Sequence, residues 1–201
     1  MPKAAIKVRP QDAGRRMSLD EFDTAEGQPG YVYELSKGIV LVSDVPNRRH
    51  LVQVQEVRRQ LMVHQLQHPD QVNMIAGSGE CKILIGAEES ERHPDVAVYK
   101  RPPDDEDNLW ANWVPDIVVE VISAGSEHRD YVEKRQEYLL FGVREYWVVD
   151  ADREEVQVLR RRAGRWTERV VRPPKVYTTK LLPGFEFHCA TVFEAAEAVG
   201  E

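Results

Sequence analysis

One acidic residue inside an apolar run constrains this chain more than any other feature. Glu120 lies within Ile117–Ile122, whose length and β-branched residues indicate a buried strand of a parallel or mixed sheet. Asp95 opens a second short apolar run. A buried carboxylate is costly unless it is paired, hydrogen-bonded or bound to a metal. The two carboxylates, followed along the chain by Lys134, therefore predict a divalent-cation site that activates a water.

Composition and cysteine usage narrow the class of protein. The chain has 201 residues, 42% of them hydrophobic and 30% charged, which is typical of a globular protein with a substantial core. No apolar run approaches the ~20 residues of a membrane span, and the first residues lack the apolar segment of a secretory signal. The two cysteines, Cys81 and Cys189, match no zinc or CxxC spacing. We therefore expect a cytoplasmic protein that has no membrane partner.

The net charge of −7 argues against nucleic-acid binding over the whole surface. It leaves room for a local basic groove, because the local field decides what binds. Basic residues cluster at Arg15-Arg16, Arg48-Arg49, Arg58-Arg59 and Arg160-Arg161-Arg162. Each cluster by itself is interpreted first as a solvated face.

Periodicity and turn signals predict a flexible leader over residues 1–16 and one α/β domain over residues 17–201. Ser18 and Glu21 form the pattern of a capping box at a helix start. We expect a hairpin over 31–42, long helices over 48–67 and 127–141, strands over 93–100, 117–122 and 143–150, an antiparallel meander over 155–171 and a helix over 191–199. A central mixed sheet should hold Glu34, Asp95 and Glu120, with the two long helices on its faces.

Helical spacing places Lys134 on one face with Tyr131 and Tyr138. An inward lysine needs a paired head group, which a carboxylate–metal cluster would supply, whereas a snorkelling surface lysine fits the spacing equally well. Asp130, four residues earlier, suits a helix cap with Glu133 or a supporting role better than direct metal binding.

Two further polar residues have a functional and a structural interpretation. Glu34 lies in a predicted strand, where periodicity alone favours an edge-strand glutamate in water. His50 opens the first long helix, and a histidine facing water is the simpler interpretation. Glu80-Cys81-Lys82 spells an ExK motif but precedes Asp95, and Asp116 suits a cap before the strand that carries Glu120.

The ordered set of motifs resembles the bacterial family of putative restriction endonucleases, within the PD-(D/E)xK nuclease superfamily. The residues that carry the resemblance span about Met17 to Phe193, nearly the whole chain. They are Tyr33-Glu34-Leu35, Gly38, His50, Pro94-Asp95, Pro115-Asp116, Val119-Glu120-Val121, Arg129-Asp130, Lys134, Tyr138, Gly142 to Trp147, Asp150 and Leu182-Pro183-Gly184-Phe185.

The resemblance implies a restriction-endonuclease-like core and metal-dependent phosphodiester hydrolysis. Asp95 and Glu120, with Glu34 as an additional acidic residue, would hold Mg²⁺ or Mn²⁺. Lys134 would be the signature lysine, moved to the helix, because Ile122 stands two residues after Glu120 where the signature has lysine. Asp130, Tyr138 and His50 would support these groups.

The resemblance implies DNA as the substrate and makes a homodimer plausible. Two other functions fit the same residues. One is a binding or assembly protein that keeps the nuclease fold without turnover, which the acidic net charge and Ile122 favour. The other is a metal-dependent hydrolase of a different phosphate ester.

Overall fold

The computed structural model describes residues 6–200, which form two compact units. Unit 1 contains residues 6–45 and 82–93, and unit 2 contains residues 46–81 and 94–200. The chain therefore leaves unit 1, builds the start of unit 2, returns to unit 1 and then completes unit 2. The single domain expected over residues 17–201 stays a prediction.

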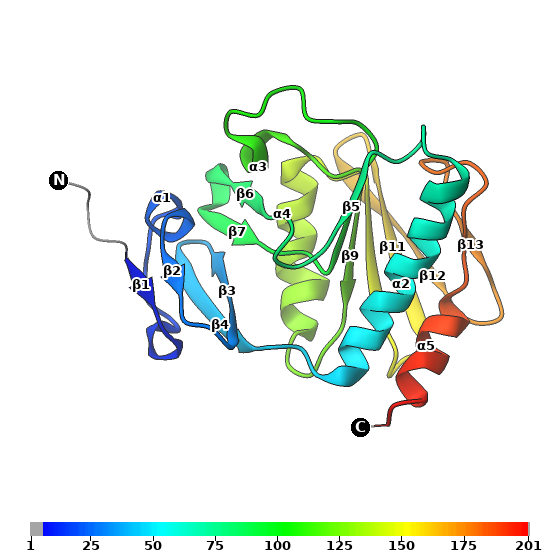
Figure 1. The fold of residues 1–201 in the computed structure, drawn as a ribbon, viewed down its shortest axis with the longest axis horizontal. Coiled ribbons are helices and arrows are strands. Elements are labelled where there is room, and N and C mark those ends of the chain that lie inside the picture. The colour runs from blue at the N-terminus through cyan, green and yellow to red at the C-terminus, as the bar shows by residue number, and fades with distance from the viewer. Residues whose placement is uncertain (1–5, 201) are drawn as a thin grey trace. The chain divides into compact units, whose positions relative to one another are not determined.

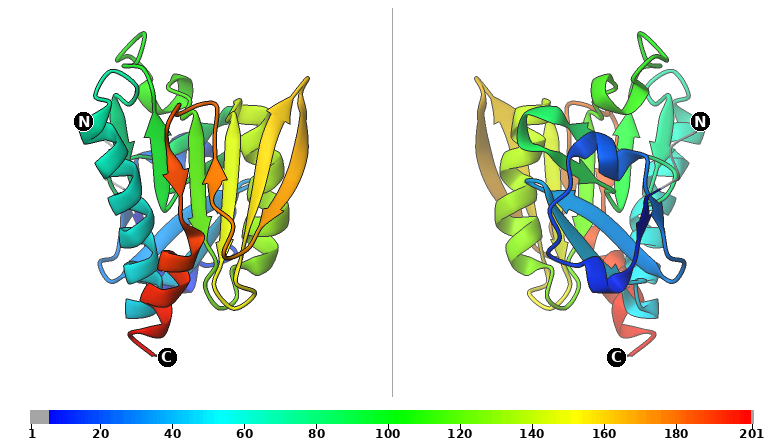
Figure 2. Two further views of the ribbon diagram at one scale, coloured as in Figure 1. Left: turned by 90° about the vertical axis from the view of Figure 1, so that its right-hand side faces the viewer. Right: turned by 90° about the vertical axis from the view of Figure 1, so that its left-hand side faces the viewer.

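Unit 2 is built on a six-stranded mixed sheet in the order β12-β11-β10-β9-β8-β5. Its strands are β5 (Met74–Ala76), β8 (Val96–Tyr99), β9 (Ile117–Val121), β10 (Glu145–Asp150), β11 (Glu155–Arg162) and β12 (Arg165–Val171). β9 and β10 are parallel, and the other neighbours are antiparallel. The expected mixed sheet and C-terminal meander are confirmed, and Figure 2 shows the β11–β12 hairpin in yellow and orange at one edge of the sheet.

Helices cover both faces of this sheet, as expected for strands that are buried on both sides. On one face, α2 (Arg48–Gln67) and α5 (Cys189–Glu197) pack with alternate strand residues such as Val119 and Trp147. On the other face, Tyr138 of α4 (Lys134–Phe141) meets the ring of Tyr146 at 5.1 Å. Figure 1 shows α2 and α4 on opposite sides of the strands. Because side chains alternate along a strand, Glu120 lies on the α4 face.

The remaining elements of unit 2 are short. They are α3 (Leu109–Asn112), a π-helical turn (Arg129–Glu133), β13 (Tyr177–Thr178) and β14 (Glu186–Phe187). The C-terminal helix begins two residues before the predicted start at Thr191, at Cys189. The predicted strand over 143–150 begins at Glu145, because Val143 still closes α4 by donating its N–H to the carbonyl of Tyr138.

Unit 1 holds a four-stranded sheet in the order β4-β3-β7-β6. Its elements are β1 (Lys7–Val8), a 3₁₀ turn (Pro10–Asp12), α1 (Leu19–Asp23), β2 (Glu26–Gly27), β3 (Tyr31–Ser36), β4 (Ile39–Asp44), β6 (Ile83–Ile85), a second 3₁₀ turn (Gly86–Glu88) and β7 (Ser90–Arg92). The capping box predicted at Ser18 and Glu21 is present. Glu34 lies on β3, so the expectation that one central sheet carries Glu34, Asp95 and Glu120 is wrong.

The flexible leader expected over residues 1–16 stays a prediction, and the described part of this segment belongs to unit 1. Its first five residues lie outside the described part of the chain. From Lys7, however, the backbone pairs with β2, and the Val8 side chain is 2% exposed. Val8 joins Phe22, Leu35 and Val40 in the small core of unit 1. Burial of these apolar side chains stabilises the contact of this segment with the rest of unit 1.

Candidate active site

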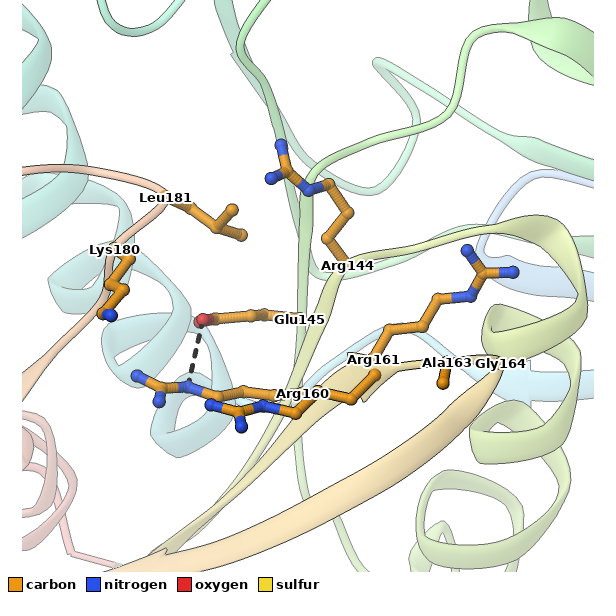
Figure 3. Close-up of a pocket in the computed structure, with 9 residues that line it drawn as sticks. Arg144, Glu145, Arg160, Arg161, Ala163, Gly164, Lys180 and Leu181 are labelled. Carbon is orange, nitrogen blue, oxygen red and sulfur yellow. Dashed lines mark ion pairs between the residues drawn. The ribbon is translucent and has the colours of Figure 1, made fainter.

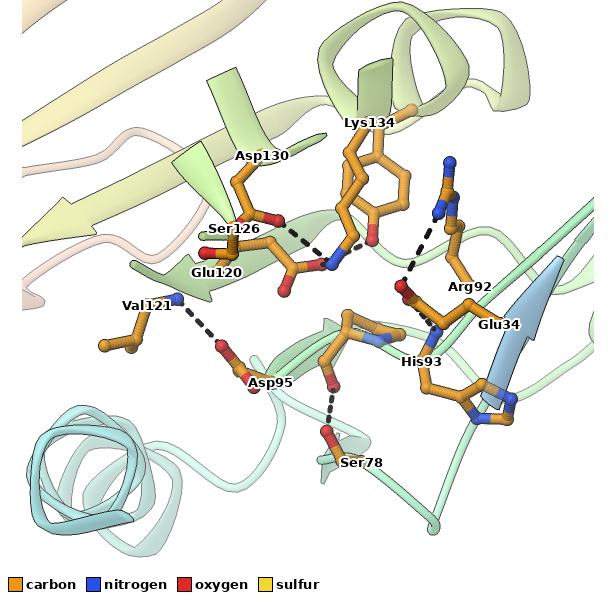
Figure 4. Close-up of polar contacts among 12 residues, drawn as sticks. Glu34, Ser78, Arg92, His93, Asp95, Glu120, Val121, Ser126, Asp130 and Lys134 are labelled. Atoms are coloured by element: carbon orange, nitrogen blue, oxygen red, sulfur yellow. Dashed lines mark hydrogen bonds and ion pairs between the residues drawn. The ribbon is translucent and has the colours of Figure 1, made fainter. Parts of the chain in front are cut away.

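The strand register brings Asp95 and Glu120 together. β8 pairs antiparallel with β9 so that Val96 lies opposite Val119, and Asp95, which directly precedes β8, lies next to the end of β9 that carries Glu120 and Val121. The N–H of Val121 donates to Oδ2 of Asp95 at 2.8 Å, so the Asp95 carboxylate is held against β9 (Figure 4).

Lys134 points inward to Glu120, which decides between the two interpretations of this lysine. Its Nζ lies 3.0 Å from Oε1 of Glu120 and 3.1 Å from Oδ1 of Asp130. The hydroxyl of Tyr138 donates to the same Glu120 oxygen at 2.5 Å. The side chains of Lys134 and Glu120 are 5% and 3% exposed. The ammonium therefore compensates two buried carboxylates, as a buried charge requires.

A π-helical turn shapes the helix that carries this lysine. The N–H of Lys134 donates to the carbonyl of Arg129, five residues earlier, instead of the residue four earlier. The hydroxyl of Tyr131, in this turn, donates to Asp150 at 2.9 Å. Asp130 lies inside the helical segment rather than at its cap, so the capping interpretation is wrong. π-Turns of this kind occur frequently at functional sites, and the sequence carries no signal for them.

His50 supports Asp95 instead of facing water. Asn47 caps α2, because its side chain accepts the N–H of His50 at 2.9 Å. This cap fixes the first turn, and Nε2 of His50 lies 3.1 Å from Oδ1 of Asp95. The His50 side chain is 8% exposed, so the solvent-facing interpretation is wrong. Within residues 6–200, its buried Nδ1 has no hydrogen-bond partner.

Glu34 is buried in unit 1, whereas periodicity favoured a glutamate in water. Its Oε2 lies 3.5 Å from Nη1 of Arg92, a side chain with no exposed surface. The N–H of His93 donates to Oε1 of Glu34 at 3.3 Å. Nη2 of Arg92 also donates to the Ser36 hydroxyl at 2.8 Å. The structure thus pairs Glu34 with an arginine inside its own sheet, a contact that the sequence analysis missed because Arg92 lies 58 residues away.

Glu80, from the ExK motif that precedes Asp95, and Asp116 both have structural roles. Glu80 accepts from Arg58 and from the N–H of Gly77, both at 2.8 Å. Asp116 accepts the N–H of Lys100 at 3.1 Å and pairs with Arg144 at 2.8 Å, as expected for a residue that caps the start of β9.

Cysteine chemistry does not compete with the carboxylates. Burial, together with the nearby negative charges of Glu80 and Glu120, raises the pKa of Cys81 to about 12. Burial also raises the pKa of Cys189. Both thiols are therefore protonated near neutral pH, whereas a nucleophilic cysteine needs a lowered pKa.

The donor set fits a hard cation with few protein ligands. Within residues 6–200, no group of three or more His, Cys, Asp or Glu side chains is arranged to hold a metal ion. Asp95 and Glu120 supply two carboxylates at the same end of neighbouring strands. Mg²⁺ is commonly held by one or two carboxylates together with substrate phosphate and water, so this pair is sufficient for it.

The fold is similar to that of a solved protein structure. The structure is similar to the crystal structure of a putative nuclease belonging to DUF820 from Anabaena variabilis, with a TM-score of 0.71 and 18% sequence identity. The similarity covers 90% of this chain and 99% of that one, and at this identity it concerns the fold. No curated protein matches the sequence. No helix among the described residues is long and apolar enough to cross a membrane.

The family comparison covers most of the chain. The sequence model of Uma2, described as putative restriction endonuclease, matches residues 19–192. This range includes all the candidate residues discussed above, from Glu34 to Tyr138. The chain therefore belongs to the Uma2 family of putative restriction endonucleases.

Proposed function

We propose that this protein is a metal-dependent endonuclease that hydrolyses phosphodiester bonds in DNA. The observation that carries the proposal is the buried contact of Lys134 with Glu120, beside Asp95 on the neighbouring strand. Asp95, Glu120 and Lys134 would provide the two carboxylates and the lysine of the nuclease signature, although Ile122 stands where the signature has lysine on the strand. The family membership supports the same class of reaction.

Asp95 and Glu120 would hold Mg²⁺ or Mn²⁺. When bound, such an ion supplies a positive charge for the phosphate oxygens and a lower pKa for the attacking water. Glu34 is a further candidate ligand that rests on the family resemblance. In the structure its carboxylate is paired with Arg92 in unit 1.

Each protein group has a defined task in this proposal. Lys134, held between Glu120 and Asp130, can donate to the attacking water and offset the charge that develops on the phosphoryl group. Tyr138 fixes the Glu120 carboxylate through its 2.5 Å hydrogen bond. His50 fixes the Asp95 carboxylate from the other side. Tyr138 and His50 are positioning residues.

Plasmid nicking tests the proposal. Purified protein is incubated with supercoiled DNA in Mg²⁺, in Mn²⁺ and in EDTA, beside Asp95→Ala, Lys134→Ala and the exposed-lysine control Lys175→Ala. We expect nicking with either metal, none in EDTA, and loss in the first two variants only. Nicking by Lys134→Ala at the wild-type rate would remove the lysine from the mechanism.

Metal binding is measured separately by calorimetry with Mn²⁺ on Asp95→Asn and Asp116→Asn. Both variants remove one carboxylate charge from the same sheet, but Asp116 caps the other end of β9. We expect weaker binding only in Asp95→Asn. Metal binding without DNA cleavage would favour a hydrolase of another phosphate ester, and the absence of both would favour a nuclease fold that only binds or assembles. A cytoplasmic location and a homodimer belong to the same proposal.

A further inference from the structure

A cluster of cations lies away from the carboxylate site, in a pocket of about 380 Å³ in unit 2. Arg144 lies just before β10, Arg160 and the two arginines after it come from the end of β11, and Lys180 comes from the loop after β13. The pocket also contains one carboxylate, that of Glu145. Figure 3 shows the side chains of Arg144, Glu145, Arg160 and Lys180 at the pocket. In a chain with a net charge of −7, this local excess of positive charge predicts an anionic ligand.

The pocket has a rigid base. Arg160 donates through Nε to the hydroxyl of Tyr177 at 3.0 Å and through Nη2 to the carbonyl of Thr178 at 3.3 Å. Its Nε lies 3.3 Å from Oε1 of Glu145. Glu145 is 4% exposed and also accepts from Trp147 and Thr179. The guanidinium at the base of the pocket is therefore held in place before any ligand arrives.

The cations continue onto the β11–β12 hairpin in an unfavourable arrangement. Arg162 and Arg165 lie directly opposite each other across the strands, and both are exposed. Like charges in this position destabilise a strand pair. Between them, Ala163 and Gly164 have φ values of 46° and 73°, the combination of a tight two-residue hairpin turn. The negative charge of a bound polyanion would offset the repulsion between Arg162 and Arg165.

The cationic hairpin, defined as Arg160, Arg162 and Arg165 with Lys180, is separate from the carboxylate site. Glu145 pairs with Ile117 at the start of β9, whereas Glu120 lies near its end. Glu145 and Arg160 also lie on the face of Trp147, which α2 and α5 cover, and Glu120 lies on the α4 face. A ligand of the cationic hairpin therefore makes a contact of its own.

We propose that the cationic hairpin binds the sugar–phosphate backbone of a nucleic acid, as a second contact distinct from Asp95 and Glu120. Arginine forks match phosphate oxygens in geometry and charge. A row of cations that extends from a pocket onto a strand pair fits a repeating anion better than a single phosphate. The inference rests on the proposed function, because that function identifies the polyanion as a nucleic acid. Binding at the cationic hairpin does not require that the protein cleaves DNA.

Anisotropy titrations of the full-length protein with a labelled duplex of about 20 base pairs test the inference, in EDTA and over a series of salt concentrations. The test variant is Arg162→Ala/Arg165→Ala, and the charge-matched control is Arg16→Ala/Lys175→Ala. For the test variant we expect affinity to fall about tenfold or more at ~0.1 M salt, and the slope of log affinity against log salt to become shallower by about 2. The thermal midpoint should stay equal or rise, because a like-charge pair is removed. Arg162→Lys/Arg165→Lys should keep most of the affinity.

Three outcomes overturn the inference. One is duplex binding by the test variant with wild-type affinity and slope, and another is an equal loss in the control. The third is a loss of inorganic phosphate binding with no loss of duplex binding, which would make the pocket a site for small phosphates. Loss of duplex binding in the test variant supports the inference even if the wild type cuts no DNA with Mg²⁺. An absence of DNA cleavage by the wild type would reject only the proposed endonuclease function.

Discussion

Glu120 and Glu34 are both strand glutamates with almost no exposed surface, and each is paired with a cation, but the two pairs differ in kind. Glu120 meets Lys134, a flexible ammonium shared with Asp130 and delivered by a helix with a π-turn. Glu34 meets Arg92, which is wholly buried in the same sheet and also bound to Ser36. An ammonium on a flexible stem can exchange partners, whereas an arginine held by several hydrogen bonds keeps its geometry.

The comparison teaches that burial of a carboxylate does not by itself identify a ligand. Glu120 has Asp95 beside it on the next strand, so a second carboxylate is available to share a cation. Around Glu34 the structure shows an arginine and a backbone N–H. We therefore expect substitutions at Glu120 to act on catalysis first and substitutions around Glu34 to act on stability first.

The largest effect is expected for Glu120→Gln. This substitution keeps the size of the side chain and a group that can accept from Tyr138, but it removes the charge that would hold the metal. DNA cleavage should fall by about a thousandfold or more, as is usual when one member of a catalytic unit is lost. Initial rates of plasmid nicking at saturating Mg²⁺ give the measurement. A reduction below about tenfold would show that Glu120 has no role in the reaction.

The counterpart in unit 1 is Arg92→Met, which removes the cation beside buried Glu34. We expect the free energy of unfolding in urea to fall by about 3–5 kcal/mol, because a buried charge loses its compensation. The double variant Glu34→Gln/Arg92→Met is the control and should recover part of this loss. If Glu34→Gln alone weakened Mn²⁺ binding as much as Asp95→Asn does, the contrast between the two glutamates would disappear and Glu34 would be a ligand.

A smaller effect is expected for His50→Gln, which changes the group that contacts Asp95. Residues that orient a metal ligand are typically worth about 10–100-fold in affinity or activity. We expect this loss in Mn²⁺ affinity by calorimetry and in the nicking rate. Substitution of exposed His128, which belongs to the same unit, serves as the control. Unchanged Mn²⁺ affinity would leave His50 as a packing residue of α2.

The smallest effect is expected for Tyr138→Phe, which removes one hydroxyl from the Glu120 side and leaves the ring packed on Tyr146. The loss of one hydrogen bond should cost about 0.5–1.5 kcal/mol of unfolding free energy. Cleavage should fall less than in Glu120→Gln, because Lys134 still holds the carboxylate. A pH–rate profile of cleavage separates a role of the hydroxyl in the reaction from a purely structural role. A profile identical to the wild type, with an unchanged rate, would make this hydroxyl purely structural.

The sequence by itself determined much of the fold and the choice of Asp95 and Glu120 as the candidate metal-binding carboxylates. A carboxylate inside a β-branched run indicates a buried charge that needs compensation. The 3.6-residue period of α2 and the turn signals of the meander depend only on residues that are close in sequence. The capping box at Ser18 is local in the same way. Local structure of this kind can be predicted because it depends on residues that are close in sequence.

Only the tertiary structure decided which charges meet. Lys134 could equally have faced water, and its inward position depends on a π-turn that has no sequence pattern. Glu34 was assigned to the central sheet and His50 to the solvent, yet one pairs with Arg92 in a separate sheet and the other with Asp95. These contacts join residues about 45 to 58 positions apart. Spacing along the chain cannot predict them, because strand pairing and helix packing bring such residues together only in the folded state.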